Sequence, residues 1–378
     1  MVNKEIVYIS DSSIPSYSAD SVHVMKMCQA FSKQGYKVTL LGKRTRNNVQ
    51  KVFDIHSFYG VDNSFKISLF PFKAFLLSGR LYNAFLPFFS FAPNTIAYTR
   101  SIYAAFWYSL FGKSIVFEIH EPFNTKGQWL KNIFQFIVSQ GYIKKWIVIS
   151  SPLRTHLISE FNIDSKEVFI AHDGAEIYRN SGFEEKELGE KFKVGYVGSL
   201  YQGKGMEIII QLSKLMKEVD FHIVGGTGSQ IGFWRSQFDE KQKNLIFHGY
   251  KAPGESHKFI SQFDILLAPY QRQVFVKNSK QANNLSTWMS PLKIFEYMSA
   301  GKPIIASDLP VIREILEHNH TALLCDPDYL PDWVASVNRI MESVGFGKNL
   351  GDNAKNALET QFTWDIRCKN ILEFLKPN

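Results

Sequence analysis

Short apolar runs alternate with stretches of helical periodicity along the whole chain, a pattern typical of parallel sheets whose strands are joined by helices. In the first half the apolar runs predict strands over residues 5–10, 37–42, 65–70, 95–99, 114–119, 145–150 and 168–172. Between the first two runs, residues 18–35 place apolar side chains at helical spacing and end at Gly35. This segment therefore predicts one β-α-β unit.

The second half repeats the pattern after a polar, charged segment over residues 179–192, which is typical of an interdomain linker. Its apolar runs predict strands over residues 193–200, 219–226, 244–250, 263–270, 302–308 and 321–327. We therefore expect an α/β fold with two doubly wound, Rossmann-like domains, 1–178 and 179–360. Such sheets bind ligands at the carboxyl ends of their strands, and two of them facing each other leave a cleft there.

A glycine-rich loop follows the first strand of the second half. In VGYVGSLYQGKG, Gly198, Gly203 and Lys204 fit the first seven positions of the phosphate-binding pattern G-x-x-x-x-G-K-[ST]. The eighth position holds Gly205 where a nucleotide triphosphatase has a Ser or Thr ligand for Mg²⁺. The loop thus predicts a diphosphate held without a metal ion.

The segment MSPLKIFEYMSAGKPIIASDLPVIREIL, residues 289–316, predicts a helix that points its N-terminal amides at the same cleft. Ser290 and Pro291 are expected to cap and open this helix, which runs from Leu292 to about Ser299. Glu296 lies on the same face as Lys293, and a carboxylate there can accept hydrogen bonds from a ribose diol. The alternative is a solvated surface glutamate.

Charge is unevenly distributed along the 378 residues. Residues 1–180 hold 20 Lys and Arg against 12 Asp and Glu, whereas the remainder is balanced, so the first half indicates an anionic partner. Residues 66–91 are rich in phenylalanine and lack acids, and they include Lys66, Lys73 and Arg80. They favour a membrane surface, with an ordinary core helix pair as the alternative. No motif of a nucleic-acid-binding module is present, so no nucleic acid is expected.

Other features point to the cytoplasm. No uncharged apolar run is long enough to span a bilayer, and the first predicted strand begins where a signal peptide would need its apolar region. Cys28, Cys325 and Cys368 are far apart in apolar or helical surroundings, which favours free buried thiols over disulfides or a metal cluster. We expect a cytoplasmic protein.

The glycine-rich loop, followed about ninety residues later by SPLKIFEYMSAGKPIIASDLPVIREIL, resembles the family-four retaining glycosyltransferases of the GT-B fold. This family builds bacterial surface polysaccharides from nucleotide sugars. Pieces of the first half, among them AYTRS, FEIHE and HDGAE, occur in the family's usual order, so the resemblance covers nearly the whole chain. It implies two Rossmann-like domains facing across a cleft and a final helix, 361–378, that crosses back onto the N-terminal domain.

The resemblance also implies roles for individual residues. Lys204 would bind the diphosphate of the donor, Glu296 would hold its ribose, and His120 would lie near the reacting sugar. The other residues expected around the donor are Gly198, Ser199, Gly203, Gly205, Gly225, Gly226, Ser290, Pro291, Leu292 and Lys293. On the acceptor side we expect Ser18, Glu121 and Arg100, although a structural ion pair is an equal alternative for Arg100.

The implied partners are a nucleotide-sugar donor and a glycan or polyprenyl-diphosphate-linked acceptor, reached from the inner face of the cytoplasmic membrane. A UDP-sugar is expected before a GDP-sugar. No cofactor and no metal ion are expected. The reaction would belong to the synthesis of a capsule, an O-antigen or an exopolysaccharide.

Two positions depart from the family pattern. Ser199 stands where the family often has an arginine that binds phosphate, and Trp288 stands where the broader family has a second glutamate. The subgroup with SPLK in this helix commonly lacks that glutamate. Lys293 is therefore expected to supply the missing cation.

Rival functions fit fewer residues. A dinucleotide-dependent dehydrogenase needs G-x-G-x-x-G after its first strand, where this chain has DSSIPS. A metal-dependent GT-A transferase would use D-x-D, but residues 326–328 lie between a strand and a helix, where Asp is a common cap. A UDP-sugar 2-epimerase and a non-catalytic sugar-nucleotide-binding protein stay open, and a transfer or donor-hydrolysis assay separates them from a transferase.

Overall fold

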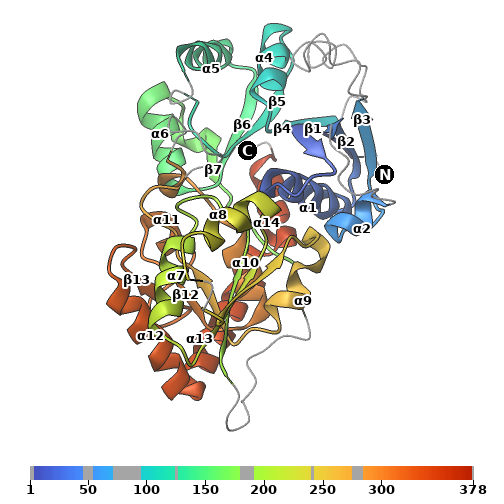
Figure 1. The fold of residues 1–378 in the computed structure, drawn as a ribbon. Helices are drawn as coiled ribbons and strands as arrows, with labels where there is room; N and C mark the ends of the chain where they lie inside the picture. The colour runs from blue at the N-terminus through green and yellow to red at the C-terminus, as the bar shows by residue number, and fades with distance from the viewer. Residues whose placement is uncertain are drawn as a thin grey trace. The chain divides into compact units, whose positions relative to one another are not determined.

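The computed structural model describes residues 4–45, 54–70, 95–123, 127–178, 191–239, 242–274 and 284–376 (Figure 1). The chain forms two compact units, Met1–His172 with Trp364–Asn378, and Asp173–Thr363. Most of the phenylalanine-rich segment, from residue 71 to 91, and most of the predicted linker, from 179 to 190, lie outside the described residues.

The first unit is built on a seven-stranded sheet in the order β3-β2-β1-β4-β5-β6-β7, and all neighbours pair in parallel. A parallel sheet is covered on both faces, which explains why all five residues of β5 are buried. The seven apolar runs of the first half are thereby confirmed as strands. They are Glu5–Ile14 (β1), Lys37–Arg44 (β2), Lys66–Phe70 (β3), Thr95–Thr99 (β4), Ile115–Ile119 (β5), Ile143–Val148 (β6) and Val168–Ile170 (β7).

Helices cover this sheet, and the last of them comes from the end of the chain (Figure 1). Helix α14 packs against α1, so the prediction that the final helix returns to the N-terminal domain is confirmed. The helices are Ala19–Lys33 (α1), Ile55–Tyr59 (α2), Ile102–Leu110 (α4), Gln128–Gln140 (α5), Ser151–Phe161 (α6) and Trp364–Phe374 (α14), with a 3₁₀ turn at Ser165–Glu167 (η4).

The second unit repeats the architecture with a six-stranded sheet in the order β10-β9-β8-β11-β12-β13, again with parallel pairing. Each of the six apolar runs of the second half forms one of these strands. They are Lys193–Val197 (β8), Asp220–Val224 (β9), Leu245–Gly249 (β10), Ile265–Ala268 (β11), Ile304–Ser307 (β12) and Leu323–Cys325 (β13).

Two apolar clusters form the core of this unit. One contains Ile294 and Met298 of α10 with Ala354 of α13, and the other contains the apolar side of α7 and Trp333 of α12. The helices are Met206–Leu215 (α7), Gly228–Arg235 (α8), Ser256–Ile260 (α9), Leu292–Ala300 (α10), Pro310–Arg313 (α11), Leu330–Glu342 (α12) and Val344–Ala357 (α13), with short 3₁₀ and π turns at Pro253–Glu255 (η5), Leu285–Thr287 (η6) and Leu358–Phe362 (η7).

Both sheets reverse the direction of their strand order once, between β1 and β4 in the first unit and between β8 and β11 in the second. Open parallel sheets bind ligands outside the carboxyl ends of the strands at such a point. Arg100 follows β4 in the first unit, and Gly198 follows β8 in the second. The fold therefore brings the predicted motifs of each unit to the place where a ligand is expected.

Two further expectations concern the chain as a whole. Among the described residues, no helix is long and apolar enough to cross a membrane. Cys28, Cys325 and Cys368 are free and buried, as their surroundings in the sequence predict. Burial raises the pKa of all three thiols, so they stay protonated at neutral pH.

Candidate functional site

The glycine-rich loop of the second unit joins β8 to α7 and packs backbone against backbone. A Cβ atom on Gly203 would lie 2.0 Å from the carbonyl oxygen of Gln273, and one on Gly225 would lie 2.0 Å from that of Gly198. Both glycines have positive φ, at +79° and +124°. Glycine is required at both positions because any other side chain would clash and strain the backbone. Gly205, also with positive φ, ends the loop at the first turn of α7, and Gly226 follows Gly225 after β9.

Two lysines converge beside this loop. The Nζ atom of Lys293 lies 3.6 Å from the ring centroid of Tyr196 and 4.9 Å from that of Tyr270, and Lys204 places its Nζ 5.4 Å from the same Tyr270 ring. Within the described part of the chain, the buried Nζ of Lys293 has no hydrogen-bond partner. An added Cβ on Gly198 would lie 3.1 Å from this Nζ, so the ammonium group lies directly beside the loop backbone.

The pKa values of both lysines reflect this arrangement. Burial lowers the pKa of Lys204 to about 8. Burial also lowers the pKa of Lys293 well below its usual range; the charge of Lys204 adds to this effect, and the charge of Glu296 opposes it. Two basic side chains lie close together, and one of them has no hydrogen-bond partner among the described residues, so a bound anion would favour the charged form of both.

Helix α10 begins beside these lysines, but not as predicted. Its N-cap residue is Pro291, no side chain caps the helix, and the hydroxyl of Ser290 accepts a hydrogen bond from the backbone N–H of Asp173 at 2.8 Å. The prediction that Ser290 caps α10 is therefore wrong, because its hydroxyl is used to hold the start of this unit. Leu292 is the first residue of α10. Because no side chain caps this end, the partial positive charge of the helix N-terminus is available to a ligand.

The other donor-side residues lie around this group. Glu296 is half-buried one turn into α10, and its charge acts on Lys293. The backbone carbonyl of Ser199 accepts the hydroxyl of Tyr196 at 2.7 Å, which fixes the ring beneath Lys293. The sequence interpretation missed Glu207, whose carboxylate accepts the N–H of Gly203 at 3.0 Å and orders the loop. An acid in the first turn of a helix that follows a glycine loop is the signal that could have identified it.

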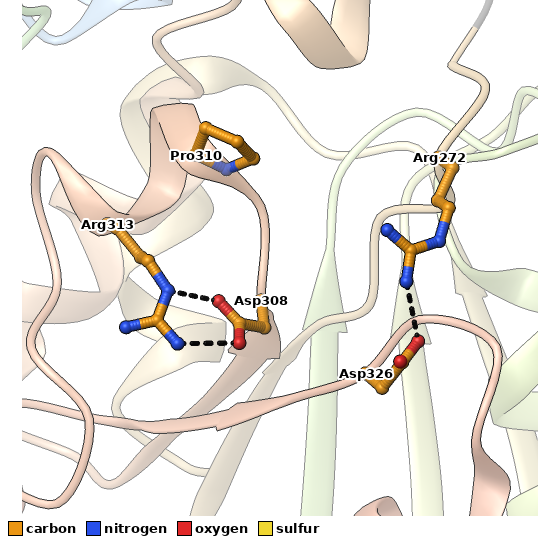
Figure 2. A pocket seen from close by; sticks show the side chains of 5 residues that line it. All are labelled: Arg272, Asp308, Pro310, Arg313 and Asp326. Carbon is orange, nitrogen blue, oxygen red and sulfur yellow. Dashed lines mark hydrogen bonds and ion pairs between the residues drawn. The ribbon is translucent and has the colours of Figure 1, made fainter.

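A cavity of about 280 Å³ in the second unit is lined by Asp326, the first residue of the D-x-D segment considered above, together with Arg272, Asp308, Pro310 and Arg313 (Figure 2). Arg272 contacts Asp326 at 3.0 Å and Asp328 at 2.5 Å, and Arg313 pairs with both oxygens of Asp308. Asp326 and Asp328 do not cap α12, whose N-cap residue is Tyr329. Both carboxylates are engaged by the guanidinium of Arg272, an arrangement typical of a structural ion pair.

In the first unit, the predicted acceptor residues follow β1, β4 and β5, which are neighbours in the sheet. Arg100 donates a hydrogen bond to the backbone carbonyl of Asp20 at 3.3 Å, close to the start of α1. Ser18 precedes α1, and its hydroxyl lies 2.7 Å from that of Ser16 without capping the helix. Glu121 is half-buried and directly follows His120. The positive charge of Arg100 contributes to lowering the pKa of His120, so the two side chains are close enough to interact electrostatically.

His120 belongs to a buried charged cluster. Its Nε2 lies 2.6 Å from Oε1 of Glu118, and the same oxygen lies 2.8 Å from Nη2 of Arg367 and 2.9 Å from Nε2 of His23. Burial and the charge of Arg100 lower the pKa of His120 to about 4, despite the opposing effect of Glu118. His120 is therefore a neutral imidazole at pH 7.

The three side chains His23, Glu118 and His120 could together offer ligand atoms to a metal ion. The guanidinium of Arg367 already lies 2.8 Å from the shared carboxylate oxygen, so a metal ion would face that positive charge at close range. The chemistry of this set fits an ion-pair network better than a metal site.

Comparisons with known proteins agree with this picture. Residues 191–343 match the family model described as Glycosyl transferases group 1. A protein of Methanocaldococcus jannaschii named as an uncharacterized glycosyltransferase is 25% identical over 239 residues, which are 61% of this chain and 57% of that protein. An alpha-galactosylglucosyldiacylglycerol synthase of Streptococcus pneumoniae is 26% identical over 137 residues, 35% of this chain and 33% of that protein. The chain thus covers less than two thirds of the length of these relatives.

Solved structures extend the likeness to the fold of nearly the whole chain. The sucrose-phosphate synthase of Thermosynechococcus elongatus has a TM-score of 0.74 at 14% identity and covers 98% of both chains. Anabaena HepE, in complex with UDP and glucose, has a TM-score of 0.71 at 14% identity and covers 99% of both chains. At such low sequence identity the structural similarity establishes the fold alone. It confirms the GT-B fold predicted from the resemblance. The chain therefore has the fold of the GT-B glycosyltransferases, and residues 191–343 of its second unit are similar to the glycosyl transferases group 1 model.

Proposed function

We propose that the protein is a retaining glycosyltransferase that moves a sugar from a nucleotide-sugar donor, a UDP-sugar before a GDP-sugar, to a glycan or lipid-linked acceptor. The observation that carries the proposal is the pair of Lys204 and Lys293 beside the glycine-rich loop, where the buried Lys293 ammonium finds no hydrogen bond among the described residues. A diphosphate supplies the charge and the acceptors that these groups need.

The same groups can promote the reaction. During transfer, the bond between the anomeric carbon and the diphosphate oxygen breaks, a bond from that carbon to the acceptor hydroxyl forms, and the departing phosphate takes the acceptor's proton. Negative charge grows on the diphosphate. Two lysines and the uncapped N-terminus of α10 stabilise this charge without a metal ion. Gly205, in place of a Ser or Thr ligand, also favours metal-independent transfer.

The remaining residues receive roles by proposal. Glu296 holds the donor ribose, since its carboxylate can accept both hydroxyls of a diol. His120 hydrogen-bonds a hydroxyl of the sugar or of the acceptor. The acceptor side includes Ser18, Arg100 and Glu121, which lie after neighbouring strands of the first unit. No cofactor takes part.

The proposed setting is the synthesis of a surface polysaccharide or glycolipid at the inner face of the cytoplasmic membrane. The basic first half supports an anionic surface or a polyprenyl-diphosphate-linked acceptor. Support also comes from the alpha-galactosylglucosyldiacylglycerol synthase among the relatives, whose name describes a glycolipid product. Surface attachment without a spanning helix is the proposed mode of localisation.

Calorimetric titration with UDP, GDP and a panel of UDP-sugars tests the donor class. We expect UDP to bind and one UDP-sugar to be hydrolysed or transferred at an unchanged rate in excess EDTA. Loss of activity in EDTA with recovery in Mn²⁺ would contradict metal independence. Binding of a UDP-sugar without any transfer or hydrolysis would indicate a non-catalytic binding protein, and conversion of the sugar to its 2-epimer would indicate an epimerase.

A further inference from the structure

The first unit buries a charged residue in the middle of its sheet. Glu118 lies on β5 between apolar neighbours, and its side chain is 0% exposed. Burial would raise the pKa of Glu118, but Arg367 and His23 together hold it well below its usual range, so the group is a carboxylate. A buried carboxylate is costly unless all its oxygens are paired, and a position on a core strand could otherwise be apolar. A charge at this position indicates a role beyond packing.

The carboxylate determines which nitrogen of His120 carries a proton. A neutral imidazole has one N–H and one unprotonated nitrogen, and an ionised carboxylate can only accept. Because Nε2 lies 2.6 Å from Oε1 of Glu118, Nε2 must carry the proton and donate it. Nδ1 is then the acceptor, and no group among the described residues forms a hydrogen bond with it. The His120 side chain remains 18% exposed, which leaves it accessible to a ligand.

Neighbouring groups hold both members of the pair in place. The ring of His23 packs edge-on against that of His120, with centroids 4.7 Å apart, and Trp364 of α14 packs edge-on behind His23. Arg367 is anchored by hydrogen bonds to the carbonyl oxygens of His172 at 2.9 Å and Ala171 at 3.3 Å. The final helix thus provides the cation that allows Glu118 to stay charged in the core.

We propose that Glu118 is a positioning residue for His120: it holds the imidazole in the Nε2–H form and presents Nδ1 as a hydrogen-bond acceptor to a hydroxyl of the sugar or acceptor. Arg367 compensates the charge of Glu118 from the last helix. The identity of the hydroxyl rests on the function proposed above. The state of the imidazole does not, because it follows from contacts within the first unit alone.

Proton NMR of ¹⁵N-histidine-labelled protein tests the first part without any substrate. We expect a slowly exchanging imidazole proton on Nε2 that disappears in His120→Asn, which assigns it. Glu118→Gln keeps an oxygen acceptor at the same place and should keep the signal. The double variant Glu118→Met and Arg367→Met removes acceptor and cation together, which avoids an uncompensated buried charge, and should lose the signal.

Tyr98→Phe is the matched control, since it removes a hydrogen bond to the other oxygen of Glu118 and leaves the contact with His120 untouched. A proton found on Nδ1 in the wild type, or a signal that survives in the double variant, overturns the proposal. If the double variant does not fold, the wild-type spectrum decides the question: a proton on Nε2 supports the proposal, and a proton on Nδ1 overturns it.

Kinetics test the second part. We expect the double variant to lose at least about tenfold in kcat, because the hydroxyl is held less precisely, with unchanged affinity for UDP. Glu118→Gln should stay within about threefold of wild type because its oxygen restores the contact. Equal kcat in all variants overturns the positioning role, whereas a wild type that shows the Nε2 proton but transfers no sugar refutes only the proposed function.

Discussion

The first unit buries Arg367 and Glu118 as a compensated pair, whereas the second unit buries Lys293 beside Lys204 with no hydrogen bond to its ammonium group among the described residues. In the first case, three side chains converge on one carboxylate oxygen and hold a neutral histidine in one orientation. In the second, two lysine amino groups lie near the ring of Tyr270, and burial lowers the pKa of both. A paired buried charge positions its neighbours, whereas an unpaired one indicates a ligand that completes the site.

Breaking the compensated pair should give the largest effect. Arg367→Met leaves the Glu118 carboxylate buried without its cation, which costs about 3–5 kcal/mol of stability. Lys293→Met removes a buried amino group that has no hydrogen-bond partner in the described part of its unit, so we expect an equal or higher unfolding midpoint. Thermal unfolding of both variants beside wild type measures the difference. An equal loss of stability in both variants would show that Lys293, like Arg367, stabilises the fold.

Removing a cation from the second unit should affect catalysis rather than stability. Lys204→Ala loses charge stabilisation in the transition state worth about 3 kcal/mol, or about a hundredfold in rate. Lys214→Ala, at an exposed lysine in the last turn of α7, is the matched control and should behave as wild type. Steady-state transfer rates measure both. A Lys204→Ala rate within about threefold of wild type would identify Lys204 as a lysine without a role in transfer.

Replacing the proposed ribose ligand should have a smaller effect. Glu296→Ala loses one set of hydrogen bonds to the donor, and we expect about tenfold weaker binding of UDP, near 1.4 kcal/mol. Glu342→Ala, at an exposed glutamate of α12, serves as the control. Calorimetric titration with UDP measures the affinity. Unchanged affinity in Glu296→Ala would make this residue an ordinary surface glutamate.

The two units also differ in how much of their chemistry the sequence could predict. Lys204 and Glu296 could be proposed as donor ligands from the sequence because a glycine loop and a helix start leave a local pattern. Glu118 lies in the middle of an apolar strand, and its partners His23 and Arg367 are far away along the chain. Only the fold brings them together.

The error at Ser290 has a related cause. A Ser-Pro pair before a helix predicts a cap. In the folded unit, however, the hydroxyl of Ser290 accepts a hydrogen bond from the backbone N–H of Asp173. Strands, their order of appearance and the final helix were predictable because they depend on apolar periodicity. Hydrogen bonds between side chains and groups more than one hundred residues away in the sequence were not predictable, because they depend on the fold.

The two lysines beside the glycine-rich loop should make donor binding depend on pH. Lys204 has a pKa of about 8 in the free protein, and a bound diphosphate raises it, so binding above this pH is accompanied by proton uptake. The affinity for UDP should therefore fall as the pH rises past 8, by at most about tenfold per pH unit for one proton. Titrations in buffers of different ionisation enthalpy measure the uptake, which should shrink in Lys204→Met. Equal affinity from about pH 7 to about pH 9 would contradict the prediction.

The smallest effect per residue is expected for binding to a membrane surface. This test compares the basic first half of the chain with the neutral second half. Each basic residue near an anionic surface contributes about 1 kcal/mol, and this attraction fades with salt. Lys66, exposed on β3, is one such residue, and Lys73 and Arg80 follow it in the sequence outside the described residues. Changing these three together to Glu should reduce co-sedimentation with anionic liposomes at low salt and leave binding to neutral liposomes unchanged.

The matched control is a variant in which three exposed lysines of the second unit are changed to Glu. These are Lys214, Lys217 and Lys243, and the variant should bind as wild type. Equal binding of wild type to anionic and neutral lipid, or no binding to either, would favour a core role for residues 66–91 and a soluble acceptor.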